Sequence, residues 1–513
     1  MLFNSLEYLL FFLPISVIVF QLLSRVPGTD RQIVWLVIAS LYFYASWKPI
    51  FLLLIMASVV INFTLGRVLI GVKQEHARLW LMAGVWLNLG LLGYFKYTGF
   101  FIDGLNALGQ WWIPMPKITL PLAISFFTFQ QIAYLVDVYR KECQEYRFSH
   151  YALFVLFFPQ LIAGPIVHHK EIMPQFLKQR PQSQLPTDLT IGITFIAVGL
   201  FKKVIMADSL ALIADPVFDS AAGDNPINSV DALLAIFAFS FQIYFDFSGY
   251  TDIAIGSARL FGIILPENFS SPYKSQSIIE IWRRWHMTLS RFLRDYLYFP
   301  LGGNRAGAIN RYRNLLITML LGGLWHGAAW TFVIWGGLHG FYLCCNHAWR
   351  ALVARIGLRE TFDHPLFRPV FVMITFLVWS VAMAFFRAAD LPTALRIIQS
   401  AFIHLSTAPA LELAGVFGDG IIARLAATTN IPLAGYFGNY ALLLTAAILC
   451  WAMPNTQQFL SNYQPVITTA KTPLKQGLLV WKPDLRFAVL TALLLGISMM
   501  NISSLSRFIY FQF

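Results

Sequence analysis

The sequence predicts an all-α, polytopic integral membrane protein with a single domain over residues 1–513. Of the 513 residues, 58% are hydrophobic and only 12% are charged, whereas about a quarter of a soluble domain is charged. Apolar runs long enough to cross or enter a bilayer recur from end to end. Neither an internal repeat nor a separate soluble segment interrupts them.

The apolar runs define the expected membrane segments. Their approximate cores are 8–24, 32–47, 50–66, 79–95, 118–136, 151–166, 187–207, 231–248, 250–265, 314–331, 332–348, 369–386, 439–453 and 487–502. Several are short or broken by Pro and Gly, which predicts re-entrant segments, because non-helical backbone at membrane depth usually lines a protein cavity. The Gly-, Ala- and Pro-rich segment 405–438 is expected to form an external loop with short helices.

The charge pattern predicts the orientation. The net charge is +12, and in a membrane chain such an excess indicates cytoplasmic loops rather than nucleic-acid binding. Basic residues cluster in alternate loops, at 25–31, 67–78, 140–147, 170–180, 283–313, 350–368 and 471–486, whereas the loop 208–231 carries only acids. The basic loops are therefore expected in the cytoplasm and the amino terminus outside. The four cysteines have no metal-binding or disulfide spacing.

Two histidines, His326 and His339, lie in the apolar stretch "LLGGLWHGAAWTFVIWGGLHG", residues 320–340. His326 is thirteen residues past Arg313, which places it ~20 Å in from the cytoplasmic end of a helix. A histidine at that depth costs free energy unless it has partners, and ionisable residues there are functional by default. The alternative is an imidazole that only bonds a neighbouring helix.

A basic segment precedes it, "SIIEIWRRWHMTLSRFLRDYLYFPLGGNR", residues 277–305. Apolar residues recur at helical spacing over 281–296, which predicts an amphipathic helix at the cytoplasmic interface with His286 near its charged face. Two interpretations stay open. The arginines bind anionic lipid, or they bind a phosphorylated donor such as coenzyme A or an acyl-carrier prosthetic group. The arginines in question are Arg283, Arg284, Arg291 and Arg294.

Two further stretches place polar groups in apolar surroundings. In "FSFQIYFDFSGYTDIAIGSARLFG", Asp246 is costly unless it is paired or hydrated. It is expected to orient a histidine, line a donor tunnel or pair with an arginine. In "LFFPQLIAGPIVHHKEIMPQF", the run breaks at Pro159, and His168 and His169 follow. Adjacent histidines do not share a metal from one helical face, so no metal site is expected.

Taken together, "RRWHMTLSRFLRDYLYFPLGGNR" and "LLGGLWHGAAWTFVIWGGLHG" resemble the membrane-bound O-acyltransferase superfamily. "FPQLIAGPIV" and "YFDFSGYTDIAIGSARLFGI" narrow the resemblance to its alginate O-acetyltransferase branch, with the D-alanyl transfer protein of teichoic acids as a cousin. The opening and the ending "RFIYFQF" also resemble that branch, so the likeness runs nearly end to end. The motif-bearing core is 79–350, and 351–513 are carboxy-terminal helices.

The resemblance implies a ring of transmembrane and re-entrant helices around a thinned centre with a tunnel. It implies His326 as the catalytic histidine and His286 as its upstream partner. Trp325, Asp246 and the four arginines are further candidates for the substrate site. The implied activity is acetyl transfer from cytoplasmic acetyl-CoA or an acyl-carrier thioester, with no bound cofactor, toward extracytoplasmic acetyltransferases that modify an exopolysaccharide. The implied location is the bacterial inner membrane.

Other functions remain open on the residues alone. A flippase of a lipid-linked glycan also needs polar groups at depth, but repeated halves are expected in a transporter. Acylation of a lipid or peptide is the alternative within enzymes. A Gly-x-Ser-x-Gly elbow is absent, which disfavours a serine acyl-enzyme.

Overall fold

The computed structural model describes residues 1–25, 28, 30–109, 112–145, 147–162, 164–178, 181–305, 307–403, 437–468, 479–502 and 508–509. Regular structure in these ranges is helical, as predicted, apart from one isolated β-bridge between Pro266 and Ile467. Six helical segments there are long and apolar enough to cross a membrane: Glu7–Ser24, Ile50–Gly71, Gln74–Leu108, Gln182–Ala222, Ser229–Leu260 and Pro365–Arg387. The expected external loop at 405–438 lies almost wholly outside the described residues.

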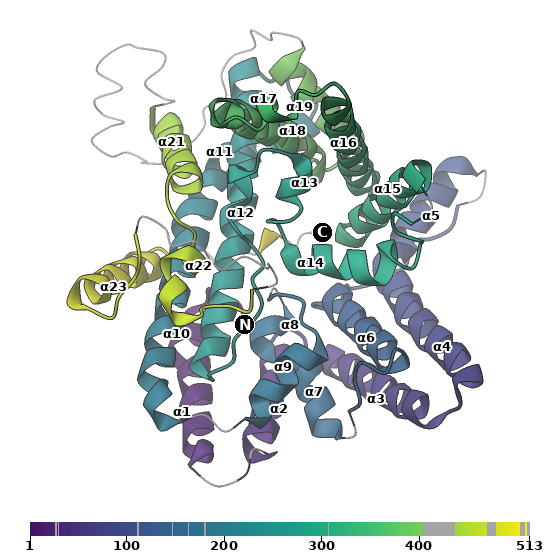
Figure 1. The fold of residues 1–513 in the computed structure, drawn as a ribbon, viewed down its shortest axis with the longest axis vertical. Coiled ribbons are helices and arrows are strands. Elements are labelled where there is room, and N and C mark those ends of the chain that lie inside the picture. Colours follow the sequence, from purple (N-terminus) through teal and green to yellow (C-terminus); the bar gives the residue numbers. More distant parts are fainter. Residues whose placement is uncertain are drawn as a thin grey trace.

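The amino-terminal half consists of helices that flank a long central one (Figure 1). In order they are η1 (Glu7–Phe12), α1 (Leu13–Ser24), α2 (Asp30–Ala45), α3 (Ile50–Gly71), α4 (Gln74–Leu92), η2 (Gly93–Tyr97), α5 (Thr98–Leu108), α6 (Ile124–Tyr139), α7 (Phe148–Leu156), α8 (Phe158–Leu161), α9 (His169–Leu177), η3 (Gln182–Gln184), α10 (Leu185–Leu200), η4 (Phe201–Ala207), α11 (Asp208–Ala222) and α12 (Ser229–Leu260). The apolar run at 151–166 breaks between α7 and α8, beside Pro159, as the sequence indicated.

The central helix α12 corrects one prediction. The cores expected at 231–248 and 250–265 form one helix of 32 residues. Gly249 does not interrupt it, because the missing side chain is needed for packing. A Cβ on Gly249 would lie 2.7 Å from the carbonyl oxygen of Gly199 in α10, and one on Gly199 would lie 2.6 Å from that of Gly249. The two backbones therefore touch at this point.

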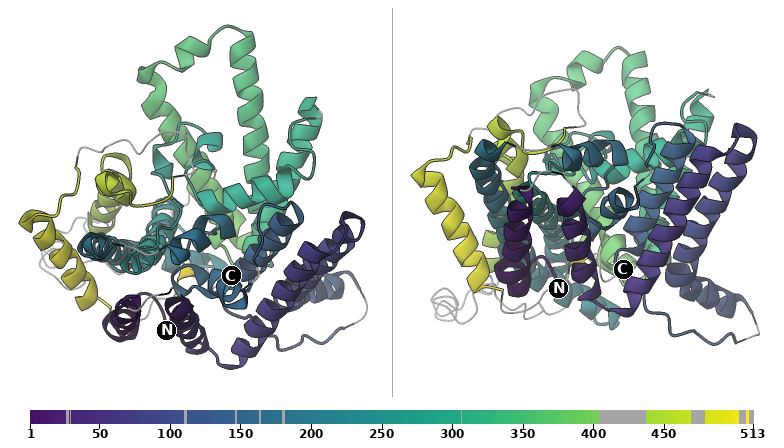
Figure 2. Two further views of the ribbon diagram at one scale, coloured as in Figure 1. Left: turned by 60° about the horizontal axis from the view of Figure 1, so that its bottom comes forward. Right: turned by 90° about the horizontal axis from the view of Figure 1, so that it is seen from below.

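The carboxy-terminal half carries the motif segments. Its elements are η5 (Pro272–Lys274), α13 (Ile278–Ile281), α14 (Met287–Leu293), η6 (Arg294–Tyr298), α15 (Gly307–His326), α16 (Trp330–Arg355), α17 (Arg359–Phe362), η7 (Pro365–Phe367), α18 (Arg368–Arg387), α19 (Leu391–Phe402), α21 (Phe437–Trp451), α22 (Thr456–Phe459), η9 (Ser461–Tyr463) and α23 (Leu485–Met500). Figure 2 shows α16, α17 and α18 extending beyond the other helices as an arch. The predicted continuous helix over 281–296 is wrong, since α13 and α14 are separated at His286.

Buried ion pairs tie α12 to its neighbours. Lys203 of η4 bonds Asp246 at 2.7 Å, and Arg259 bonds Asp188 of α10 at 2.8 Å. Lys202 bonds Asp252 at 2.6 Å. These carboxylates lie almost entirely out of solvent, and pairing offsets the large cost of burying their charge.

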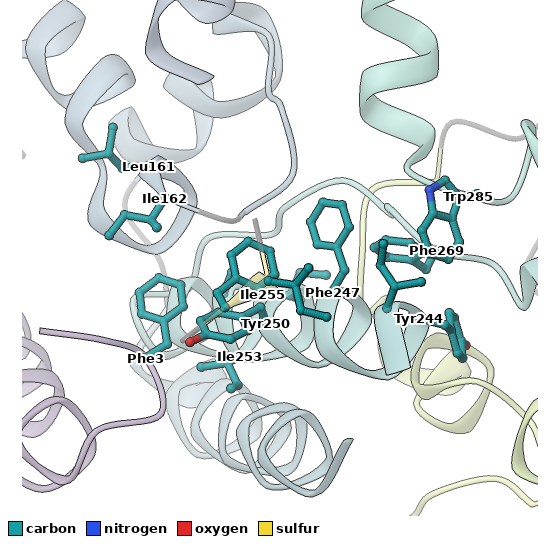
Figure 3. Packing of buried hydrophobic residues seen from close by; sticks show 14 of the residues in the cluster. Phe3, Leu161, Ile162, Tyr244, Phe247, Tyr250, Ile253, Ile255, Phe269 and Trp285 are labelled. Atoms are coloured by element: carbon teal, nitrogen blue, oxygen red, sulfur yellow. The ribbon is translucent and has the colours of Figure 1, made fainter. Parts of the chain in front are cut away.

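Aromatic side chains fill the space between α12 and the segment around residue 286 (Figure 3). The Phe247 ring lies 5.0 Å from Phe269, which lies 5.1 Å from Trp285, both edge to face. Such contacts stabilise a core beyond simple burial. They give the irregular chain at 267–286 a rigid wall on the side of α12.

Candidate active site

His326 is the last residue of α15 and is only 4% exposed. Its ring packs against three aromatic rings, those of Trp325, Trp335 and Phe386, with centroids 4.9, 5.1 and 5.4 Å away. The imidazole is therefore enclosed by apolar faces, as its surroundings in the sequence predicted.

Glycines bring α15 and α16 into direct backbone contact beside this residue. A Cβ on Gly323 would lie 2.2 Å from the carbonyl oxygen of Phe332, and one on Gly336 would lie 2.3 Å from that of Met319. Gly340 continues the contact, since its Cβ would lie 3.1 Å from the Cα of Leu316. The chain turns at residues 327–329 to start α16. The close approach fixes how far His326 stands from Trp335.

His286 is wholly buried, not near a charged face as predicted. It adopts φ +41°, in the left-handed region, and precedes α14. This conformation costs about 1–3 kcal/mol for a non-glycine residue and persists where the surroundings impose it. The His286 ring lies 4.7 Å from Phe247 and 6.3 Å from Trp325. Trp325 therefore contacts both histidines.

Asn268 holds the His286 ring and was missed by sequence reasoning. Its main-chain oxygen accepts from the Met287 N–H at 2.9 Å. Its side-chain Oδ1 accepts from the Thr288 N–H at 3.3 Å and from the Thr288 hydroxyl at 2.8 Å, and it lies 3.1 Å from Nδ1 of His286. The Thr288 hydroxyl in turn accepts from the Ile166 N–H at 3.0 Å, so its proton is free to point at Asn268.

This network assigns the tautomer of His286. An oxygen that already accepts from a backbone N–H is an acceptor for the ring as well, so Nδ1 carries the proton and Nε2 keeps its lone pair. Nε2 has no hydrogen-bond partner among the described residues. Burial lowers the pKa of His286 to about 3, so the ring is neutral at physiological pH. A neutral imidazole with a free lone pair is able to accept a proton.

A cavity of about 890 Å³ opens on the side of the basic segment. It is lined by the middle of α15, by α14 and by Arg283, Arg291, Arg294 and His347. Met287, next to His286, also lines it. A volume of this size is typical of small-molecule sites.

The four predicted arginines have different partners. Arg291 makes a two-pronged pair with Glu171 of α9, at 2.5 and 2.9 Å. Arg294 bonds Asp295 at 2.7 Å, and Arg284 bonds Glu280 at 2.7 Å without lining the cavity. Arg283 lines the cavity, and its guanidinium pairs with none of the residues that the structure describes. Arg283 is thus the arginine whose charge is available to a ligand.

A second, smaller pocket of about 100 Å³ contacts the other end of α15. His326 and Trp325 line it, together with Lys96, Ser125 and Trp47. Trp47 precedes α3, at the end opposite to the basic loop 67–78. His326 therefore lines the small pocket, and His286 directly precedes Met287, which lines the large cavity on the basic side.

Several buried polar atoms around the histidines have no protein partner among the described residues. They are the indole nitrogens of Trp325, Trp335 and Trp282, both ring nitrogens of His339, and Nε2 of His286. Trp282 and Trp335 pack on His339, and Trp335 packs on His326, so these atoms lie in one aromatic cluster. Buried polar groups normally have partners.

The remaining predicted residues are placed elsewhere. Asp246 pairs with Lys203, and not with an arginine as one prediction had it. It also accepts from the Ile509 N–H at 3.1 Å, so its carboxylate holds the carboxy-terminal chain against α12. His168 lies 3.0 Å from the Tyr296 hydroxyl, and His169 lies 3.2 Å from Glu145. In the described parts of the chain no group of three or more His, Cys, Asp or Glu is arranged to hold a metal.

Comparison with known proteins identifies the family of this chain. Residues 138–388, which include both histidines, match the membrane-bound O-acyltransferase family. The chain is 38% identical to the probable alginate O-acetylase AlgI of Pseudomonas putida over the full length of both. It is 39% identical to the protein of the same name from Azotobacter vinelandii, again over 100% of each chain. It is 42% identical to the peptidoglycan O-acetyltransferase of Helicobacter pylori over 78% of this chain and 79% of the relative.

The chain belongs to the membrane-bound O-acyltransferase family and is a multi-pass membrane O-acyltransferase. The resemblance stated from the motifs is confirmed, and with it the enzyme class. The flippase alternative is thereby set aside.

Proposed function

We propose that this protein takes acetyl from a cytoplasmic thioester and passes it across the bacterial inner membrane for O-acetylation of an exopolysaccharide of alginate type. An extracytoplasmic acetyltransferase would receive the acetyl group and modify the polymer. The observation that carries the proposal is that buried His326 lines the small pocket while the neighbour of buried His286, Met287, lines the large one. The names of the relatives support acetyl as the group transferred.

The donor side is the basic one. A phosphorylated donor, acetyl-CoA or a phosphopantetheine on a carrier protein, suits a cavity of about 890 Å³ with an unengaged guanidinium at Arg283. Arg291 and Arg294 line the same cavity but already bind carboxylates. We assign phosphate binding first to Arg283, and give Arg291 the role of joining α14 to α9.

The size of the pocket on the acceptor side supports a relay, in which this protein passes acetyl to an intermediate acceptor and not directly to the polymer. A pocket of about 100 Å³ lies well below the ~300–1,000 Å³ of ordinary small-molecule sites. It suits a single hydroxyl-bearing side chain better than a polymer of sugar rings. This favours transfer to a partner protein or small carrier over direct acetylation of the polysaccharide.

The proposed chemistry needs a base and a close approach. The acceptor hydroxyl adds to the thioester carbonyl while its proton passes to His326. The tetrahedral intermediate then expels the thiolate, which takes that proton, so that an ester and a free thiol form. His286, held by Asn268 with its Nε2 lone pair free, would bind and orient the reacting group. General-base catalysis by a histidine is worth ~10²–10⁴-fold.

A tunnel through a thinned centre, as the family resemblance implies, would join the two pockets. The donor thioester would enter from the cytoplasm and the acceptor from outside. Which polysaccharide is acetylated depends on the partner, since the relatives include both alginate and peptidoglycan enzymes by name. Acylation of a lipid or peptide is the competing activity within the family, and the pocket sizes favour it less.

The test uses purified protein in vesicles loaded with radiolabelled acetyl-CoA, with the extracytoplasmic acetyltransferase and polymer outside. Label should reach the polymer with wild-type protein and fall ~10²–10⁴-fold with His326→Ala. His76→Ala is the matched control, because His76 is exposed at the start of α4 and should behave as wild type. Equal transfer by His326→Ala would overturn the catalytic role. Efficient polymer labelling without any other protein would overturn the relay.

A further inference from the structure

Two neighbouring side chains from η2 cap the end of α15. The ammonium of Lys96 donates to the carbonyl oxygens of Trp325 at 2.6 Å and His326 at 2.9 Å. The hydroxyl of Tyr97 donates to the carbonyl oxygen of Leu324 at 2.8 Å. The last carbonyls of a helix have no partner within it. Here three consecutive ones are bonded by residues more than 220 positions earlier in the chain.

The charge of Lys96 has no carboxylate beside it among the described residues. A lone ammonium in a low-dielectric interior is costly. The carboxyl end of a helix carries a partial negative charge and binds cations there. The two hydrogen bonds to carbonyl oxygens of α15 therefore offset part of the cost of placing Lys96 in the apolar stretch "GYFKYTGF".

The capped residues are the ones that carry the site. Helix ends fray unless their terminal groups are bonded, and His326 is the terminal residue. Its carbonyl, and those of the two residues before it, are bonded by side chains of η2. Fixing this backbone fixes the direction in which the His326 side chain leaves it, between Trp335 and Phe386.

We propose that Lys96 and Tyr97 are positioning residues that hold the terminal turn of α15, and with it the His326 imidazole, in the geometry needed for acyl transfer. The inference rests on the proposed function, since it takes His326 as the base. Neither residue needs to touch substrate for this role. The ammonium also faces the small pocket, so an acceptor-binding role is the alternative that the experiment must separate.

The experiment measures kcat and KM for donor and acceptor with four variants in vesicles. Lys96→Met removes the charge at similar length, Lys96→Arg keeps it, and Tyr97→Phe removes one hydrogen bond. Tyr94→Phe is the matched control, because Tyr94 belongs to the same element but is 59% exposed. Wild type and His326→Ala give the transfer rates with and without the proposed base. If His326→Ala transfers as wild type does, the proposed function fails; if only the Lys96 and Tyr97 variants do, this inference alone fails.

Lys96→Met should lower kcat ~10²-fold with both KM values unchanged, the loss typical of a reacting group displaced by ~1 Å. Tyr97→Phe should lower kcat ~5-fold, equivalent to one net hydrogen bond. Lys96→Arg should recover most of the activity. Wild-type kcat in Lys96→Met would overturn the positioning role. A rise in acceptor KM at unchanged kcat would overturn it too, by making Lys96 a binding group. If Lys96→Met does not fold, the kcat of Tyr97→Phe decides, and an unchanged value overturns the inference.

Discussion

Replacing Gly336 by alanine should disable the enzyme while leaving it folded. The added Cβ would lie 2.3 Å from the carbonyl oxygen of Met319, about 1 Å short of the 3.4 Å at which ordinary contact begins, and 3.1 Å from the Cα of Gly323. Both neighbours are backbone atoms, so no side chain is available to rotate away. The helices α15 and α16 must separate by roughly that ångström.

The magnitude follows from the same distances. Overpacking of this kind costs ~1–3 kcal/mol of stability, which a large membrane domain tolerates. A shift of ~1 Å between Trp335 on α16 and His326 on α15 should cost ~10²-fold in transfer rate. The expected phenotype is therefore a near-normal amount of folded protein with kcat reduced about a hundredfold.

The assay is kcat in vesicles, with folded protein measured by size-exclusion chromatography and thermal unfolding. Gly337→Ala is the matched control, since its Cβ would meet only the flexible Cδ2 of Leu320 at 3.3 Å. It should retain most of the activity. Normal kcat in Gly336→Ala, or equal loss in both variants, would refute the argument that backbone contact sets the position of His326.

Three further predictions test the site and the topology. Asn268→Leu keeps a similar size but removes the acceptor of the His286 Nδ1–H. It should reduce transfer roughly 10- to 100-fold, because a buried donor loses its hydrogen bond. Unchanged transfer would show that the assigned tautomer is not required. Arg283→Gln should raise donor KM several-fold with little change in kcat, measured with acetyl-CoA, and a fall in kcat alone would argue against phosphate binding. In a cysteine-free background, a cysteine at position 219 should react with an impermeant thiol reagent in whole cells and one at position 311 should not; the reverse pattern would invert the orientation.

Much of this protein was predictable from its sequence. Whether a segment can cross a membrane depends on its own length and apolar composition, and not on distant residues. The sequence therefore predicted a helical multi-pass protein correctly. His326 stood out because a polar residue in an apolar run is costly at membrane depth. His286 and the family membership came from long local motifs. The two apolar runs on either side of Gly249 were wrongly predicted to be separate segments. In the sequence, a glycine that allows close contact between helices cannot be distinguished from a glycine that interrupts a helix.

Only the tertiary structure decided how the candidate site is held together. The predicted helix over 281–296 breaks at His286 because Asn268, 18 residues earlier, bonds its ring and the two residues after it. The sequence did not distinguish Arg291 from the other three arginines. In the structure its guanidinium forms an ion pair with Glu171, which lies 120 positions earlier in the chain. No pattern of apolar residues around Lys96 indicated its role, because the carbonyl groups that it binds lie 229 and 230 residues further along the chain. Periodicity reports which face of a helix is buried, whereas the partner of a buried polar group depends on which distant segment packs beside it, and that is decided only when the chain folds.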